Sequence, residues 1–306
     1  MKNKRGRRKF IQAALTLPAV LSVNPFLAYS EAGPADKSRS FGDCQLKTSL
    51  NAFSFNDLLM GGNFSLDDLL DFCVDNCLGA VDITGYYLPG YPEVPKDDFI
   101  YDLKRKVFTR GLEISGTGIR NNFTDPDENK RKADIQLIKN WIGCASKMGA
   151  PVIRIFAGQP PDDSLSRDKI LDWLVEDVKE CVEYGKSQGV MVGIQNHNDF
   201  IKTSEHARKI LDRVQSDWFG LILDTGSYRF GDPYKEIENT ARYALNWQIK
   251  KTVFVNGKEE PVNMKKLIRI IRESGYRGYL PIETLPPDDP RIEVPVLLGE
   301  LKRAIK

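Results

Sequence analysis

Short apolar runs alternate along the chain with longer segments whose apolar residues recur at helical spacing. The run at residues 219–224 reads Phe-Gly-Leu-Ile-Leu-Asp, and residues 152–157 carry a similar run. Such runs are typical of strands that helices cover on both faces, because no face of the strand is left for polar residues. Between the runs, segments such as residues 166–186 place Ile170 and Leu174 on one side of a helix. The pattern therefore predicts alternating strands and helices.

This alternation repeats eight times from about residue 43 to the end of the chain. The predicted strands cover residues 46–54, 80–84, 112–117, 152–157, 190–195, 219–224, 247–255 and 279–283. Glycines at the predicted helix ends indicate tight returns into the next strand, at Gly79, Gly111, Gly149, Gly189 and Gly275. Eight such units predict an α/β fold of the (β/α)8 TIM barrel class. An open doubly wound sheet is the alternative, but no G-x-G-x-x-G turn follows the first strand.

The first 42 residues do not follow this pattern. The Arg7-Arg8 pair resembles the twin-arginine export signal, and a moderately apolar stretch at residues 10–28 follows it. We predict a signal peptide at residues 1–32, a linker at 33–42 and a barrel domain at 43–306. Pro18 and Pro25 make a membrane anchor the weaker alternative. The protein is therefore expected to be exported to the periplasm, without stable membrane insertion.

Composition narrows the range of partners. The 306 residues include 44 Lys and Arg against 42 Asp and Glu, which gives a formal net charge of +2. A nucleic-acid-binding protein usually carries a clustered basic excess, whereas much of the small excess here lies in the first nine residues. We therefore expect no nucleic-acid partner. A homo-oligomer stays open.

Polar oxygen donors end four of the apolar segments in the second half of the chain. They are Gln195, Asp224, Gln248 and Glu283. The carboxyl ends of barrel strands meet at one face, where sites are built, so we predict that these four side chains converge on one divalent cation. Two carboxylates and two amide carbonyls are hard oxygen ligands, which favour Mg²⁺ or Mn²⁺ over Zn²⁺. The alternative for Gln248 is a packed residue of the barrel wall.

The same strand ends resemble those of a known family, the sugar isomerases and epimerases with a xylose-isomerase-like TIM barrel, which also includes endonuclease IV. The matching motifs are Gln195-Asn196-His197 for the family's Glu-Asn-His, Leu223-Asp224-Thr225-Gly226 for its Leu-Asp-Thr-Gly, Gln248-Ile249-Lys250 for its His-x-Lys, and Ile282-Glu283 for its Ile-Glu. The resemblance covers nearly all of the predicted barrel domain.

This resemblance implies a divalent metal ion held by the four oxygen donors, with two glutamates moving a proton between sugar carbons. Gln195 and Gln248 depart from the family pattern, because an amide neither takes nor gives a proton at neutral pH. Glu283 and Lys250 remain as acid–base candidates, with His197 close enough to help. We therefore predict a metal-dependent sugar isomerase or epimerase that acts by enolisation next to a carbonyl.

Further side chains near strand ends are candidates for contacts with the sugar. They are Tyr86, Arg120, Asn121, Arg154 and Trp247. Aromatic rings stack on sugar faces, although the same rings also pack loops. Two other functions stay open on this scaffold: a lyase or hydratase of a keto-sugar, and a sugar-binding barrel without turnover. Endonuclease activity is not expected, because a three-zinc phosphodiesterase needs many histidines and the chain has two.

Overall fold

The computed structural model describes residues 46–160 and 165–306, which belong to one compact unit. The predicted signal peptide and linker, residues 1–42, lie outside the described residues, so both stay predictions. Within residues 46–160 and 165–306, none of the helices combines the length and the apolar character that crossing a membrane requires.

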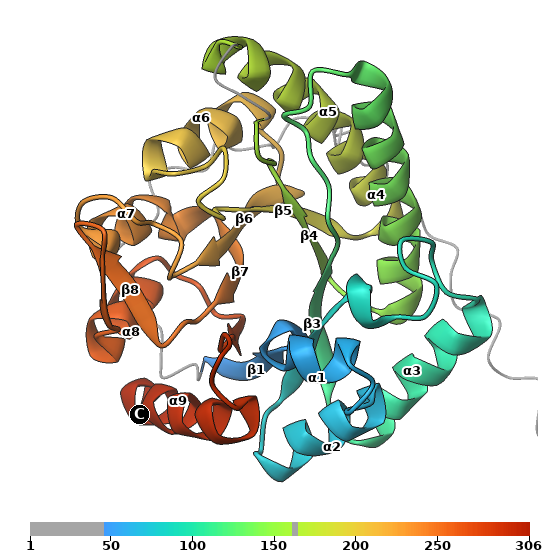
Figure 1. The fold of residues 1–306 in the computed structure, drawn as a ribbon, viewed down its shortest axis with the longest axis vertical. Coiled ribbons are helices and arrows are strands. Elements are labelled where there is room, and N and C mark those ends of the chain that lie inside the picture. Colours follow the sequence, from blue (N-terminus) through green and yellow to red (C-terminus); the bar gives the residue numbers. More distant parts are fainter. Residues whose placement is uncertain (1–45, 161–164) are drawn as a thin grey trace, which may run out of the picture. The chain divides into compact units, whose positions relative to one another are not determined.

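Eight parallel strands of the described chain form the wall of a barrel (Figure 1). They are β1 (Lys47–Asn51), β2 (Ala80–Thr84), β3 (Glu113–Gly118), β4 (Val152–Phe156), β5 (Met191–Gln195), β6 (Phe219–Asp224), β7 (Ala244–Gln248) and β10 (Tyr279–Ile282). Each strand pairs with the next, and β1 pairs with β10. Between β7 and β10, the Ile249 N–H donates to the Pro281 carbonyl over 2.8 Å, and the Glu283 N–H donates to the Ile249 carbonyl over 3.0 Å. The predicted (β/α)8 TIM barrel is confirmed.

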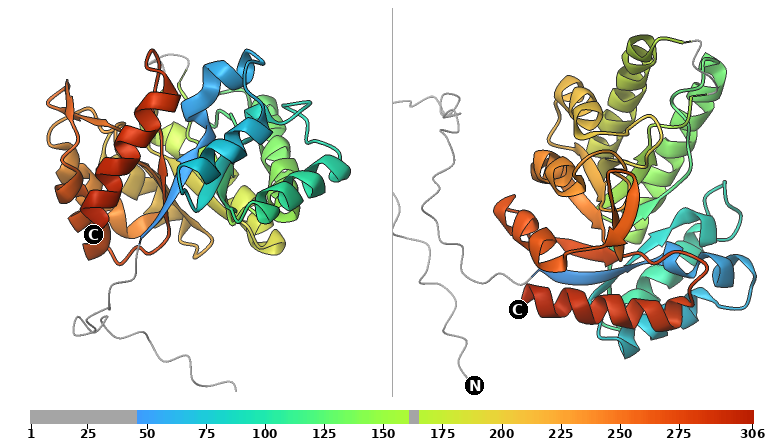
Figure 2. Two further views of the ribbon diagram at one scale, coloured as in Figure 1. Left: turned by 90° about the horizontal axis from the view of Figure 1, so that it is seen from below. Right: turned by 60° about the vertical axis from the view of Figure 1, so that its left-hand side comes forward.

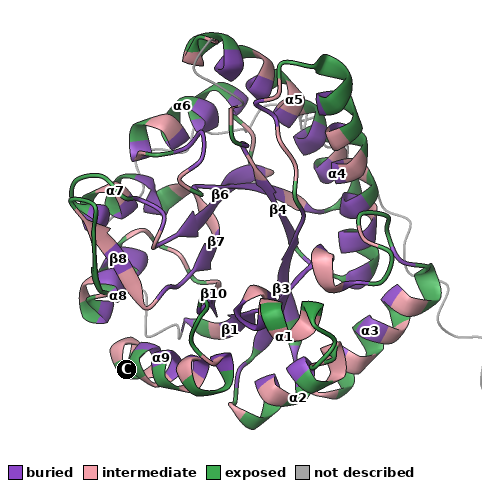
Figure 3. Ribbon diagram, in the orientation of Figure 1, coloured by how far each residue is buried: buried purple, intermediate pink, exposed green. Residues whose placement is uncertain are grey.

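Helices surround the strands on the outside, as the views in Figures 1 and 2 show. They are α1 (Asn56–Met60), α2 (Leu66–Asp75), α3 (Asp97–Thr109), α4 (Glu128–Met148), α5 (Arg167–Gln188), α6 (Ser204–Val214), α7 (Pro233–Thr240), α8 (Met264–Glu273) and α9 (Pro290–Ile305). The strands and the inward helix faces are buried, whereas the outward helix faces are exposed (Figure 3). Every residue of β2 and β6 is buried, as expected for strands covered on both faces.

Local sequence signals set the ends of the helices. Ser65 forms a capping box at the start of α2, in which side chain and backbone satisfy each other's hydrogen bonds. Gly149 and Gly189 end α4 and α5 with left-handed φ angles of 86° and 70°, as predicted. Gly79 does not take this conformation, and Cys77 has the positive φ, 52°, at that joint.

The close approach of α5 to β5 depends on one helical glycine, which gives a first testable prediction. A Cβ on Gly185 would lie 2.6 Å from the Val190 carbonyl oxygen, a backbone atom that cannot move away cheaply. Gly185→Ala is therefore expected to lower the free energy of unfolding by about 1–3 kcal/mol. Gly143→Ala on α4 is the matched control, because a Cβ there meets nothing within 4 Å. Alanine should stabilise that helix by about 0.5–1 kcal/mol. Urea unfolding of both variants measures the difference, and two equal changes would contradict the close approach.

Part of the barrel interior is polar. The Asn246 amide donates to the Asp82 carboxylate and to the Ser115 carbonyl, both over 3.2 Å. The Ser49 and Ser115 hydroxyls lie 2.7 Å apart. Burial raises the pKa of the Asp82 carboxyl to about 7. Hydrogen bonds thus satisfy an interior that purely aliphatic side chains fill in many barrels of this class.

The prediction of one continuous strand at residues 247–255 is wrong. Strand β7 ends at Gln248, and a separate antiparallel hairpin follows, made of β8 (Thr252–Val255) and β9 (Lys258–Pro261). Asn256 and Gly257 form its two-residue turn, both at positive φ. This is the geometry that an Asn-Gly pair favours, so the sequence carried a signal for the hairpin.

Candidate active site

The carboxyl ends of the strands open into a cavity of about 590 Å³, a volume within the range of small-molecule sites. A smaller cavity of about 50 Å³ shares part of its lining. The predicted site residues that line one or both cavities are Tyr86, Arg154, Gln195, His197, Asp224, Gln248, Lys250 and Glu283. Most of the predicted site residues therefore meet at the barrel mouth.

The four predicted metal ligands lie together. The Gln195 amide donates to Asp224 Oδ2 over 3.0 Å and to Gln248 Oε1 over 2.6 Å. Glu283 joins this group through Lys250, whose ammonium contacts the Glu283 carboxylate and lies 3.7 Å from Asp224 Oδ2. The four side chains thus lie close together, as the strand ends predicted, and the Lys250 ammonium lies among them.

Lys250 is buried between the two carboxylates. Its side chain is 10% exposed, against 7% for Glu283 and 2% for Asp224. Burial alone would lower the pKa of Lys250, but the carboxylates of Asp224 and Glu283 outweigh it and raise the pKa above its usual value. Burial raises the pKa of Glu283, and the ammonium opposes that shift. Lys250 is therefore a buried cation within the site.

Two residues without a predicted role hold this group in place. The Asn196 amide accepts from the Asp224 N–H over 2.8 Å and donates to the Asp224 carbonyl over 2.9 Å. The Thr225 hydroxyl accepts from the Lys250 N–H over 3.0 Å and donates to the Gln248 carbonyl over 3.2 Å. Both follow a predicted ligand directly in the sequence, and that neighbouring position was the available signal.

His197 lies at the rim of the cavity. Its side chain is solvent-exposed, and its ring centroid is 4.6 Å from that of Phe156. The surrounding protein still removes enough water to lower the pKa of His197, an effect that Asp224 opposes. The neutral imidazole therefore predominates at pH 7, and this form can both accept and donate a proton.

Arg154 and Tyr86 form a second polar group at the mouth. The Arg154 guanidinium donates to the Tyr86 hydroxyl over 2.5 Å and to the Ile119 carbonyl over 3.1 Å, and it lies 4.0 Å from the ring centroid of Phe156. A guanidinium has five N–H donors, so these two bonds leave others for a ligand. Arg120 stacks on the Tyr86 ring at 4.6 Å and is itself exposed.

Two residues predicted to contact the sugar, Asn121 and Trp247, line neither cavity at the mouth. The Asn121 side chain bonds twice to the backbone of Phe156, over 2.9 and 2.8 Å, so its amide joins two strand ends. Trp247 is completely buried, and its ring lies 5.9 Å from that of Tyr276. Successive residues of a strand point to opposite faces, so Trp247 points away from the cavity that its neighbour Gln248 lines.

The side chains present do not fit a divalent cation. Gln195 directs N–H groups toward Asp224, and turning the amide over would place its carbonyl oxygen against the carboxylate. The Lys250 ammonium already lies between the two carboxylates. Across residues 46–160 and 165–306, no group of three or more His, Cys, Asp or Glu side chains is arranged to hold a metal ion. The predicted role of these residues as metal ligands therefore lacks support from their geometry.

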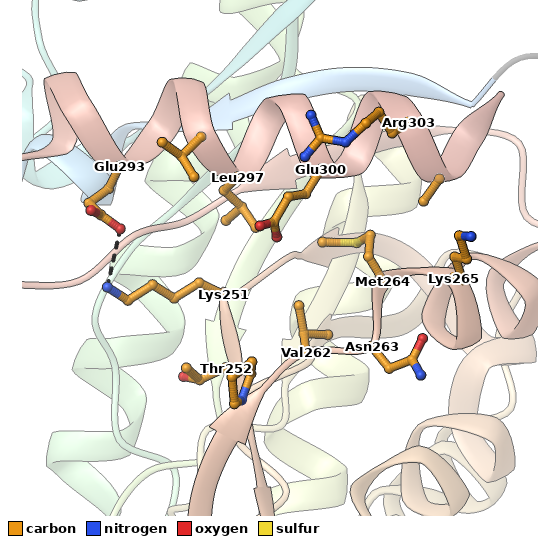
Figure 4. A pocket seen from close by; sticks show the side chains of 13 residues that line it. Lys251, Thr252, Val262, Asn263, Met264, Lys265, Glu293, Leu297, Glu300 and Arg303 are labelled. Atoms are coloured by element: carbon orange, nitrogen blue, oxygen red, sulfur yellow. Dashed lines mark hydrogen bonds and ion pairs between the residues drawn. The ribbon is translucent and has the colours of Figure 1, made fainter.

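A larger cavity, of about 1000 Å³, is lined by residues of α8, α9 and the hairpin (Figure 4). Lys251 lines it and forms an ion pair with Glu293 of α9 over 3.2 Å. None of the predicted site residues belongs to this lining. Lys251 also lines the cavity at the mouth, but its side chain is 41% exposed, whereas Lys250 is buried between two carboxylates.

The sequence and the fold are similar to those of known proteins. The family model described as xylose isomerase-like TIM barrel matches residues 80–297. Among curated proteins, none matches in sequence. A D-psicose 3-epimerase from Clostridium cellulolyticum H10, solved with D-tagatose, has a TM-score of 0.70 and 15% identity, over 85% of this chain and 100% of that one.

Two further solved structures share the fold. A 3-keto-D-glucoside 4-epimerase from E. coli has a TM-score of 0.67 and 15% identity, over 85% of this chain and 99% of that one. The IOLI protein with a bound zinc atom has a TM-score of 0.67 and 16% identity, over 85% and 96%. At these identities the structures show a common fold, while the family model spans most of the chain. The chain belongs to the xylose isomerase-like TIM barrel family.

Proposed function

We propose that the protein is an isomerase or epimerase of a free sugar or sugar derivative, acting by enolisation next to a carbonyl. The observation that carries this proposal is the buried ion pair of Lys250 and Glu283 in a cavity of small-molecule size at the barrel mouth. The D-psicose 3-epimerase and the 3-keto-D-glucoside 4-epimerase of the same fold support this reaction class.

The chain's own residues supply each part of an enolisation. The Glu283 carboxylate takes the proton from the carbon next to the carbonyl, and the C–H electrons form the enolate double bond. The Lys250 ammonium donates a hydrogen bond to the oxygen on which negative charge develops. Glu283 then returns the proton to carbon, while neutral His197 moves a proton between the two oxygens. Burial, which raises the pKa of Glu283, makes it a better base near neutral pH.

The position of Gln195 favours isomerisation over epimerisation. Inverting one carbon requires a proton to leave one face of the enolate and return to the other, which takes two titratable groups. Gln195 cannot titrate, so Glu283 acts from a single face. A shift of the carbonyl to the neighbouring carbon needs only that one face. Epimerisation would require His197 as the second group.

Binding without turnover is the second candidate function. The observation that favours it is the pairing of both carboxylates, Asp224 and Glu283, with Lys250, which holds the proposed base, Glu283, in an ion pair. The keto-sugar lyase stays an alternative, because the same enolate can expel a hydroxyl group from the next carbon.

Solvent deuterium tests these functions together. The purified protein is incubated with a panel of aldoses and keto-sugars in D₂O, and the products are followed by mass spectrometry. Enolisation predicts exchange of a carbon-bound hydrogen for deuterium without other mass change. A lyase predicts the loss of one water molecule. A sugar that stabilises the protein against thermal unfolding but never exchanges identifies a binding protein and contradicts the proposal.

Arg154 is expected to hold the sugar through its remaining N–H donors. Arg154→Met keeps a long unbranched side chain and removes the guanidinium with its charge. A hydrogen bond to a charged group is worth about 1.5–3 kcal/mol, so the dissociation constant should rise by about 10- to 100-fold. Titration calorimetry with the sugar found above measures it. Arg120→Met should change affinity far less, because Arg120 does not line the cavities. An equal loss of sugar affinity in both variants would mean that the arginines act only through their positive charge and not through direct hydrogen bonds.

The place of action is part of the proposal. The Arg7-Arg8 pair and the apolar stretch that follows it support export by a twin-arginine route. We therefore place the reaction in the periplasm. Fractionation of cells that produce the full chain tests this, and an Arg7→Lys, Arg8→Lys variant should remain in the cytoplasm.

A further inference from the structure

We propose that the ammonium of Lys250 is the built-in cation of this site and takes the place of a divalent metal ion. The claim concerns the site and does not depend on the reaction proposed above, because metal binding is measured directly.

The position of the charge is the first argument. The Lys250 ammonium contacts the Glu283 carboxylate and lies 3.7 Å from Asp224 Oδ2. These are the two charged oxygen donors among the four predicted ligands, and a metal ion would have to use both. An ion bound there would lie beside a buried ammonium, where like charges repel strongly in a poorly solvated environment. Lys250 therefore occupies the place that the ion would need.

The two amides are the second argument, and it is independent of the first. The Gln195 amide uses one N–H for Asp224 Oδ2 and the other for Gln248 Oε1. In each of these bonds, an N–H group of Gln195 occupies a lone pair of an oxygen that would otherwise be free to bind a cation. The carbonyl oxygen of Gln248 is at the same time engaged by an N–H donor. The group is therefore hydrogen-bonded as it stands and offers a metal ion few free lone pairs.

Charge balance is the third argument. Asp224 and Glu283 carry two negative charges, and buried charges of one sign are costly unless they are paired. Lys250 supplies one positive charge in direct contact, and Arg154 lines the same mouth. The carboxylates are thus compensated by side chains of the chain itself. Such compensation is permanent, whereas a bound metal ion depends on its concentration.

The neighbouring lysine shows that this placement is specific. Lys251 pairs with Asp288 and with Glu293 of α9, and its side chain is 41% exposed (Figure 4). It carries the same charge and the same number of carboxylate partners as Lys250, but it is solvated. Lys251 is therefore the matched control for every test of Lys250.

Mn²⁺ alone, without any sugar, is the probe for the first experiment. Electron paramagnetic resonance of the purified full chain counts the ions bound per protein. The wild-type protein should show no site tighter than about 1 mM, and washing with a chelator should leave its thermal unfolding temperature unchanged. Stoichiometric binding of Mn²⁺ at micromolar concentrations by the wild type overturns the proposal.

Variants test whether Lys250 is what excludes the ion. The triple variant Gln195→Glu, Gln248→His, Lys250→Ala replaces two amides with ionic and imidazole ligands and removes the ammonium. It should bind Mn²⁺ about 100-fold more tightly than the wild type. The variant Gln195→Glu, Gln248→His, Lys251→Ala keeps Lys250 and should bind Mn²⁺ more weakly than the variant that lacks it. Equal binding by the two triple variants, or none by a folded Lys250 variant, contradicts the proposal.

A single variant keeps the test decisive if the triple variant does not fold. In Lys250→Ala, two carboxylates are left without their ammonium, so millimolar Mn²⁺ should raise its thermal unfolding temperature. The same addition should not change the unfolding temperature of the wild type or of Lys251→Ala. A Lys250→Ala protein that Mn²⁺ fails to stabilise shows that no cation site was vacated and overturns the proposal.

Discussion

Lys250→Met is expected to lower the free energy of unfolding by about 3–5 kcal/mol, the usual cost of removing one partner from a buried ion pair. Methionine keeps much of the apolar stem of lysine but leaves Glu283 and Asp224 facing each other without a counter-charge. Their side chains are 7% and 2% exposed, so water would compensate for the lost ammonium only in part. Urea unfolding at constant pH measures the change.

The adjacent lysine provides the control for this stability change. Lys251→Met removes the same charge from a solvated position, where ion pairs contribute about 0–1 kcal/mol. A double variant, Lys250→Met with Glu283→Gln, should recover part of the loss, because one of the two unpaired charges is gone. Equal destabilisation by Lys250→Met and Lys251→Met would show that the buried pair has no special role.

Glu283→Gln should slow deuterium exchange into the sugar by about 10²- to 10⁴-fold, the usual contribution of a general base. The amide has nearly the same shape and can still accept a hydrogen bond from Lys250, but it cannot take a proton. Sugar affinity should change much less than the rate. Initial rates of exchange, with binding measured separately by calorimetry, distinguish the two effects.

Glu260→Gln on the exposed strand β9 is the control for the glutamate substitution, since it removes a carboxylate that lines neither cavity at the mouth. Its exchange rate should match the wild type. If Glu283→Gln exchanges at the full rate, the base is another carboxyl group of the barrel, and Asp82 is the one with a pKa raised to about 7.

The barrel was predictable because its strands are short, largely apolar runs that alternate with amphipathic helices. Strand β2 begins and ends at the residues that the pattern indicates. The error at β7 has a physical cause. All of residues 247–255 suit a strand, so the pattern of apolar residues alone cannot show where the chain leaves the barrel wall. The Asn256-Gly257 turn did mark a hairpin, but it marked the far end of the stretch.

The place of the site was predictable, whereas its contacts were not. Strand ends converge in any parallel barrel, and this alone brought Gln195 and Glu283 to one mouth. The sequence does not show which way a side chain turns at a strand end. Lys250 lies between two carboxylates because Thr225 fixes its backbone, and Trp247 points outward because of strand register. Both facts require coordinates.

The Lys250–Glu283 pair also spans the junction between β7 and β10, where the Ile249 backbone bonds to Pro281 and Glu283. Any opening fluctuation that parts this junction would separate the acid–base pair before the rest of the barrel unfolds. Amide hydrogen exchange at Ile249 and Glu283 would then report the fraction of molecules in which the pair is separated. The charged pair thus links β7 and β10, the two strands that close the barrel, so that the chemistry and the closure depend on the same contact.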